Sequence, residues 1–64
     1  MSEIIINRLK ESEGKEIKIF LQNGFHYTGK CLNSDEKYVE ILDYKLNAIK
    51  LLQISDIKDL EVRE

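Results

Sequence analysis

The spacing of apolar residues predicts a short amphipathic helix at the start of the chain. Leu9 lies four residues after Ile5, which is the spacing of one helical face, and Ser2 is a suitable N-cap. Gly14 is a typical helix terminator, so the predicted helix covers residues 3–12. A helix this short is not stable alone in water, and we therefore expect its apolar face to pack on a sheet.

From Lys15 onward, apolar residues recur at every second position, which is the period of a β-strand. In the first such segment, Ile17, Ile19 and Leu21 share one face, and Phe20 points to the other. Five short strands are predicted, at residues 15–22, 25–32, 38–42, 48–54 and 57–62, of which the last fits the alternation imperfectly. One helix followed by five closely spaced strands predicts a mostly β fold, in which a strongly bent five-stranded antiparallel sheet forms a small SH3-type barrel.

Turn residues separate these strands. Asn23-Gly24 lies between the first two and predicts a β-hairpin with a type I′ turn, since Asn and Gly both adopt the positive φ that this turn requires. Further turns are predicted at residues 33–37, at residues 43–47 and at Ser55-Asp56. Gly29 lies inside the second strand, where a glycine indicates a bulge, a sharp bend or the close approach of another backbone.

The chain has 64 residues and is expected to form a single domain, residues 1–64, with a small hydrophobic core. Cys31 is the lone cysteine and has no partner for an intramolecular disulfide. No His/Cys cluster has the spacing of metal ligands, so neither a metal nor another cofactor is expected. Association with further copies of the chain is the remaining way to bury more surface.

The same composition indicates a cytoplasmic protein. A single cysteine suits a reducing compartment, and the sequence shows neither a signal peptide nor an apolar run long enough to cross a membrane. The net charge is −2 and like charges form no long block. Nucleic-acid binding is therefore not indicated by charge and has to rest on local sites.

The run GKEIKIFLQNGFHYTGKCLNSD resembles the first motif of the Sm-like family, which comprises the Sm, LSm and Hfq proteins. That motif has a glycine before alternating apolar residues, a turn glycine, a second glycine about five residues later and an aspartate six residues after that. Gly14, Gly24, Gly29 and Asp35 occupy these positions. The hairpin segment IFLQNGFHYTG is most similar to Hfq, and the resemblance extends over residues 4–62.

This resemblance implies a helix-capped bent sheet and assembly into a homo-hexameric or homo-heptameric ring, in which strand four pairs with strand five of the next copy. It also implies non-catalytic binding of single-stranded RNA, U-rich or A-rich, as an RNA chaperone or RNA-protein scaffold. The second family motif differs here. Gln53, Ile54 and Ser55 stand where Sm proteins have Ile-Arg-Gly and Hfq has Tyr-Lys-His, and Val39 stands where Sm proteins have Asn. The alternative is therefore a structural or protein-interaction ring that has lost RNA binding.

The resemblance implies one RNA-binding surface near the pore of such a ring. Its candidate residues are Asp35, Lys37, Tyr38, Gln53 and Ser55. Tyr38 can stack on a base, and the Gln53 amide can both donate and accept hydrogen bonds. The alternative is that Tyr38 is a core or interface residue, that Gln53 and Ser55 cap a turn, and that Asp35 caps its own loop.

A second implied surface surrounds the hairpin turn, where Hfq binds purine-rich RNA. Its candidates are Phe20, Phe25, His26, Tyr27 and Thr28. Phe20 points away from the predicted core and is expected to be exposed. Phe25 and Tyr27 share a face of the second strand, so the alternative is that both belong to the core.

The residues do not indicate an enzyme. His26 has no serine, cysteine or carboxylate placed nearby in sequence to work with it, and Cys31 is better read as a small buried hydrophobe than as a nucleophile. The acidic residues are scattered over turns and form no spaced catalytic pair. Lys10, Lys30 and Arg63 are candidates for phosphate contacts, although isolated cations of this kind usually lie on the solvated surface.

Overall fold

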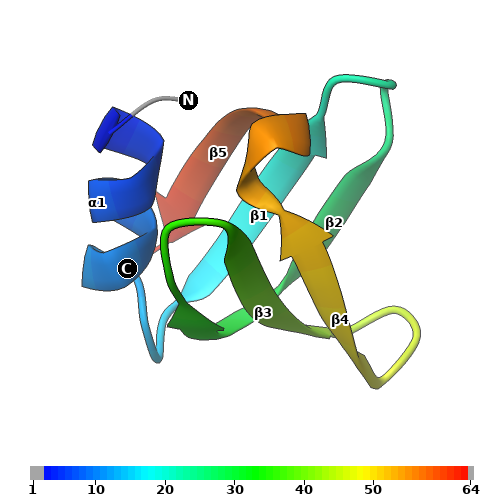
Figure 1. The fold of residues 1–64 in the computed structure, drawn as a ribbon. Helices are drawn as coiled ribbons and strands as arrows, with labels where there is room; N and C mark the ends of the chain where they lie inside the picture. Colours follow the sequence, from blue (N-terminus) through cyan, green and yellow to red (C-terminus); the bar gives the residue numbers. More distant parts are fainter. Residues whose placement is uncertain (1–2, 64) are drawn as a thin grey trace.

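A single bent antiparallel sheet accounts for most of the chain, as a computed structural model that describes residues 3–63 shows (Figure 1). Helix α1 (Glu3–Glu11) comes first and is followed by β1 (Glu16–Leu21), β2 (His26–Ser34), β3 (Tyr38–Asp43), β4 (Ala48–Gln53), the 3-10 helix η1 (Ile54–Asp56) and β5 (Ile57–Arg63). The strand order is β4-β3-β2-β1-β5. The predicted fold class is therefore confirmed.

The core lies inside the curl of this sheet. Ile17 and Ile19 of β1 are fully buried, as are Val39 and Ile41 of β3, so the alternation in the sequence identifies the inner face correctly. Fully burying an aliphatic side chain of this kind contributes about 2 kcal/mol. Cys31 joins the cluster from β2, and the cluster is completed by Leu9, Ile54 and Ile57.

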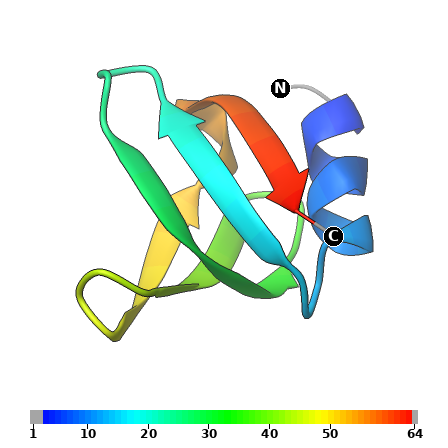
Figure 2. The ribbon, with the colours of Figure 1, turned by 180° about the vertical axis from the view of Figure 1, so that it is seen from behind.

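Helix α1 closes one side of the core, beside β5 and the loop between β2 and β3, as two opposite views show (Figures 1 and 2). Leu9 is its fully buried residue, and the Cys31 thiol contacts the Leu9 carbonyl oxygen at 3.7 Å. After Glu11 the Ser12 hydroxyl donates to the Arg8 carbonyl oxygen at 2.6 Å, which satisfies one of the free carbonyls at the helix end. The predicted cap, Ser2, lies outside the described residues.

The hairpin between β1 and β2 is confirmed, but the predicted type I′ turn is wrong. Gly24 N–H donates to the Leu21 carbonyl at 3.1 Å, and Leu21 N–H donates to the Phe25 carbonyl at 2.8 Å. Gly24 has φ +93°, whereas Asn23 does not have a positive φ. The loop therefore has three residues, with a type I turn followed by a left-handed glycine. Asn23 contributes through its side chain, which accepts the N–H of Phe25 at 3.1 Å.

Gly29 allows the backbones of β2 and β3 to approach closely. It is buried and pairs with Asp43, and a Cβ atom in its place would overlap the carbonyl group of Leu42. The register of the β2–β3 pair shifts a little further along, between Cys31 and Asn33. The sequence left a bulge, a sharp bend or a close approach open at Gly29. The close approach is the feature that requires glycine, and the bulge lies at the register shift between Cys31 and Asn33.

Most predicted boundaries agree with the structure to within one residue, and two of the displacements have a clear cause. Asn33 and Ser34, expected in a turn, still pair with β3, so the turn is confined to residues 35–37. Ile54, expected to end the fourth strand, begins η1 instead, where its N–H donates to the Lys37 carbonyl at 2.8 Å and its side chain is buried. In both places a tertiary hydrogen-bond partner overrides the local pattern.

The imperfect alternation in the last strand also has a structural reason. Phe20 pairs with Asp59 but Leu21 pairs with Ile57, so Lys58 is an extra residue in β5. The bulge restores the inward direction of Leu60 and Val62 after Ile57. Strands β4 and β5 are the two edges of the sheet.

The close approach at Gly29 leads to a stability prediction. Gly29→Ala is expected to lower the free energy of unfolding by about 3 kcal/mol, because the new methyl group has to displace the backbone of β3. Gly24→Ala is the matched control: its Cβ would meet nothing within 4 Å, so only its left-handed φ is costly, at about 1 kcal/mol. Urea unfolding at one protein concentration measures both values, and an equal loss in the two variants would contradict this account of Gly29.

Candidate nucleic-acid interface

The structure brings four of the five pore-side candidates together. Lys37, Tyr38, Gln53 and Ser55 line one open hollow of about 210 Å³. Tyr38 begins β3 and pairs with Gln53 at the end of β4. The hydrogen bond from Ile54 N–H to the Lys37 carbonyl joins the two segments at this point. The β3–β4 pairing therefore brings Lys37 and Tyr38 next to Gln53 and Ser55, although the two pairs are distant in sequence.

The side chains in this hollow are available for a ligand. The Tyr38 side chain is exposed rather than part of the core. Gln53 makes no capping hydrogen bond to η1, so the turn-capping alternative is wrong for this residue. Ile54, between Gln53 and Ser55, is buried and faces the core. The hollow thus offers an aromatic ring, an amide, a hydroxyl and an ammonium group.

Asp35 has a different role from the other four. Its Oδ1 accepts the N–H groups of Lys37 at 2.7 Å and of Tyr38 at 2.8 Å. These bonds from Tyr38 and Lys37 hold the pKa of the Asp35 carboxyl below its ordinary value. Asp35 therefore caps the loop that presents Lys37 and Tyr38, as the alternative interpretation expected, and does not line their hollow.

The hairpin-face candidates divide into two groups. Phe20 and His26 are cross-strand neighbours on the outer face of β1 and β2, with ring centroids 6.0 Å apart. The Lys18 ammonium lies 5.3 Å from the Phe20 ring centroid, which is the range of a cation–π contact. Phe20 is half-buried rather than exposed as expected, because the side chains of His26 and Lys18 lie beside its ring. It does not line the groove formed by the other hairpin-face candidates.

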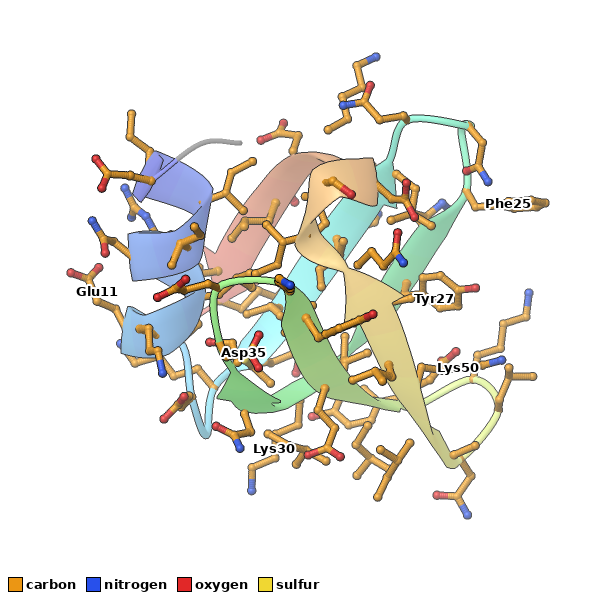
Figure 3. The ribbon with its side chains drawn as sticks, in the orientation of Figure 1. Glu11, Phe25, Tyr27, Lys30, Asp35 and Lys50 are labelled. Carbon is orange, nitrogen blue, oxygen red and sulfur yellow. The ribbon has the colours of Figure 1, made fainter. Side chains whose placement is uncertain are left out.

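Phe25, His26, Tyr27 and Thr28 line a larger groove of about 570 Å³. Phe25 is 67% exposed, so the interpretation as a core residue is wrong for Phe25. Tyr27 is half-buried and packs against the core cluster, so that interpretation is partly correct for Tyr27. Figure 3 shows Phe25 and Tyr27 on the same side of the molecule as Lys50 of β4.

The opposite wall of this groove lies in the segment for which the sequence predicts only a turn, residues 43–47. It is formed by Asp43, Tyr44, Lys45 and Leu46. Tyr44 N–H donates to the Thr28 carbonyl at 3.1 Å, which holds the loop against β2. Tyr44 and Leu46 are the residues from which the sequence could have indicated this wall, because large apolar side chains are unusual in a solvated turn, and both are exposed in the structure. The groove and the Tyr38 hollow lie at opposite ends of the β3–β4 pair.

The Cys31 thiol is not activated as a nucleophile. Burial raises the pKa of the Cys31 thiol to about 11, and the nearby Glu13 carboxylate adds to this shift, so the nucleophilic thiolate is disfavoured. Within residues 3–63, no three His, Cys, Asp or Glu side chains are grouped so that they could hold a metal ion. The helix in the same range lacks the length and apolar character that crossing a membrane requires.

Comparison with known proteins shows which fold this is. No protein-family model matches the chain, and no curated protein matches it in sequence. Among solved structures, a crystal structure of Hfq, described as a pleiotropic translational regulator, superposes with a TM-score of 0.78. The match covers 91% of this chain and 97% of that chain. The chain has the Sm-like fold. Sequence identity to that Hfq is 20%, so the likeness concerns the architecture alone.

The Sm-like fold confirms the resemblance inferred from the segment Gly14 to Asp35 at the level of architecture. The turn glycine, the glycine of close approach and the loop-capping aspartate each have a visible structural reason. The loop between β3 and β4, which supplies half of the groove, lies outside that segment.

The hydrogen bonds to Asp35 lead to a pH prediction. Because its pKa is lower in the folded than in the unfolded chain, the charged form stabilises the fold above the ordinary pKa of 3.8, and this stabilisation disappears as pH falls through the folded value. Asp35→Asn keeps an acceptor oxygen without the charge. We expect it to be less stable than the original protein at neutral pH and equally stable below the folded pKa of Asp35.

Urea unfolding across the acid range measures this difference, with Glu36→Gln as the control. Glu36 is the exposed neighbouring carboxylate, and its removal changes the net charge equally. A stability difference for Asp35→Asn that stays constant over the whole pH range would contradict the role of the Asp35 charge.

Proposed function

We propose that this protein is a cytoplasmic, non-catalytic Sm-like protein that assembles into a ring of identical copies and binds single-stranded RNA. The observation that carries this proposal is the hollow in which the exposed Tyr38 ring meets the Gln53 amide and the Ser55 hydroxyl. A flat base can stack on the ring while its edge pairs with the two polar groups. The residues that line this hollow are four of those that the family resemblance assigns to the pore-side surface.

Ring assembly is supported by the two sheet edges. Strands β4 and β5 have only one neighbour each within the described chain, and an unpaired strand edge readily pairs with another chain. Ile49 and Leu51 of β4 are 61% and 64% exposed. A chain of 64 residues has little core, and pairing of β4 with β5 of the next copy would bury further apolar surface.

A ring also reconciles RNA binding with a net charge of −2 per chain. Stacking needs no net positive charge, and repetition around a rotation axis converts weak contacts into one strong interaction with a single strand. Lys37 provides a local cation beside the proposed base site. The similarity of the fold to that of Hfq, a translational regulator, supports a role for this protein in RNA chaperoning or scaffolding.

The competing function is a ring that serves a structural or protein-interaction role without RNA. It is favoured by the replacement of the second motif, because Ile54, which stands where the family has Arg or Lys, is uncharged and buried. The hollow described above favours RNA binding instead.

Native mass spectrometry with short oligo-U and oligo-A tests both parts of the proposal. We expect a closed ring that takes up one RNA strand per assembly. Tyr38→Ala should weaken oligo-U binding about tenfold or more, since loss of one stacked base corresponds to about 1–3 kcal/mol. Phe25→Ala should weaken oligo-A binding to a similar extent, so each variant serves as the control for the other surface.

A salt titration provides the independent check. RNA binding should weaken as salt increases, because phosphate contacts release counterions. A ring that ignores both RNAs would support the protein-interaction role, and a protein that remains monomeric would contradict the proposed assembly.

A further inference from the structure

Asp43 has a buried carboxylate that the fold uses only in part. The residue is 3% exposed, at the end of the inner face of β3. Its Oδ1 accepts the N–H of Lys45 at 2.9 Å. Within residues 3–63 the Asp43 carboxylate accepts no other hydrogen bond. Its second oxygen has no partner there but is not completely enclosed. Because Asp43 lines the groove, this second oxygen is open to a ligand there.

The position of this carboxylate is rigid. Asp43 pairs with Gly29, where the close approach of β2 and β3 leaves no room for a side chain on the glycine. The next residue, Tyr44, is tied to β2 through its bond to the Thr28 carbonyl. Burying a carboxylate is costly unless its oxygens have hydrogen-bond donors, so a preset acceptor with a free oxygen favours a ligand that supplies N–H groups.

Aromatic side chains stand on both walls of the groove beside Asp43. Phe25 on one wall is 67% exposed and Tyr44 on the other is 51% exposed. Exposed aromatic rings bind flat apolar faces, and a carboxylate repels phosphate. The combination therefore suits a planar ring that carries hydrogen-bond donors on its edge. Lys45, the one lysine of the groove, can hold the negatively charged backbone of such a ligand away from Asp43.

Guanine is the base whose edge fits an acceptor of this kind. Its N1–H and 2-amino groups are adjacent donors, whereas adenine and cytosine present one amino group and uracil one imino group on the corresponding edge. Unpaired bases in single-stranded RNA are read at this edge by proteins. We propose that the groove between Phe25 and Tyr44 is a guanine-selective subsite in which Asp43 accepts hydrogen bonds from the base. This inference rests on the proposed binding of single-stranded RNA.

The test compares three oligonucleotides of identical length with uridine at all other positions. The first carries guanosine at every third position, the second inosine and the third adenosine. Inosine retains N1–H and lacks the 2-amino group, so the comparison isolates one donor without changing the protein. Fluorescence anisotropy at one salt concentration should give affinities in the order guanosine, inosine, adenosine, with guanosine at least about tenfold tighter than adenosine.

Asp43→Asn tests the protein side. The asparagine keeps an oxygen for the Lys45 N–H but presents an amino group in place of the second acceptor, so the loop should fold while guanosine selectivity disappears. Glu13→Gln removes the same charge from an exposed turn outside the groove and should leave the selectivity unchanged.

The outcomes separate this inference from the proposed function. Equal binding of the three oligonucleotides, or unchanged selectivity in Asp43→Asn, would overturn the guanine subsite and leave RNA binding intact. Failure to bind any of them would overturn both. Uptake of an arginine peptide instead of RNA would also overturn it, because a guanidinium group offers the same paired N–H donors.

Discussion

The contact between Gly29 and the backbone of Leu42 is the constraint on which most of this structure depends. With no side chain at this position, β3 can lie against β2 while the sheet curls over its core. The same contact places Asp43 opposite Gly29 and brings the loop after β3 over Thr28. One close approach between two strands therefore shapes both the barrel and the larger groove.

The curl of the sheet also determines where the two candidate surfaces lie. Strands β3 and β4 run antiparallel, so Tyr38 meets Gln53 at one end and Asp43 meets Ala48 at the other. One end carries an aromatic ring beside neutral polar groups and a lysine. The other carries the rings of Phe25, Tyr27 and Tyr44 beside a buried carboxylate. The two ends of the β3–β4 pair therefore present chemically different surfaces on one small chain.

The small core explains why association is physically attractive for this chain. Eight side chains form the buried cluster, and no disulfide adds to it because the lone thiol of Cys31 is free. Both edges of the sheet remain unpaired within the described residues, and aliphatic side chains are exposed on β4. Such a subunit gains from a neighbour in two ways, through strand pairing and through burial of apolar surface.

The spacing of apolar residues was sufficient to predict the helix, the five strands and the inner face of β1, because burial of one face imposes the period directly. It was insufficient for local detail that depends on distant partners. The type of the hairpin turn, the start of η1 at Ile54 and the extra residue in β5 all follow from hydrogen bonds or register between segments.

The candidate site shows the same division. The sequence by itself determined that aromatic residues flank a hairpin, and it offered loop capping as the alternative to an RNA contact for Asp35, since both features depend on neighbouring residues. Only the tertiary structure decided that Phe25 is exposed while Tyr27 packs on the core, and that residues 43–46 form the second wall of the groove. The physical reason is that a groove between two strands belongs to neither strand alone. Its walls meet only after the backbone has folded, here because β3 lies closely against Gly29.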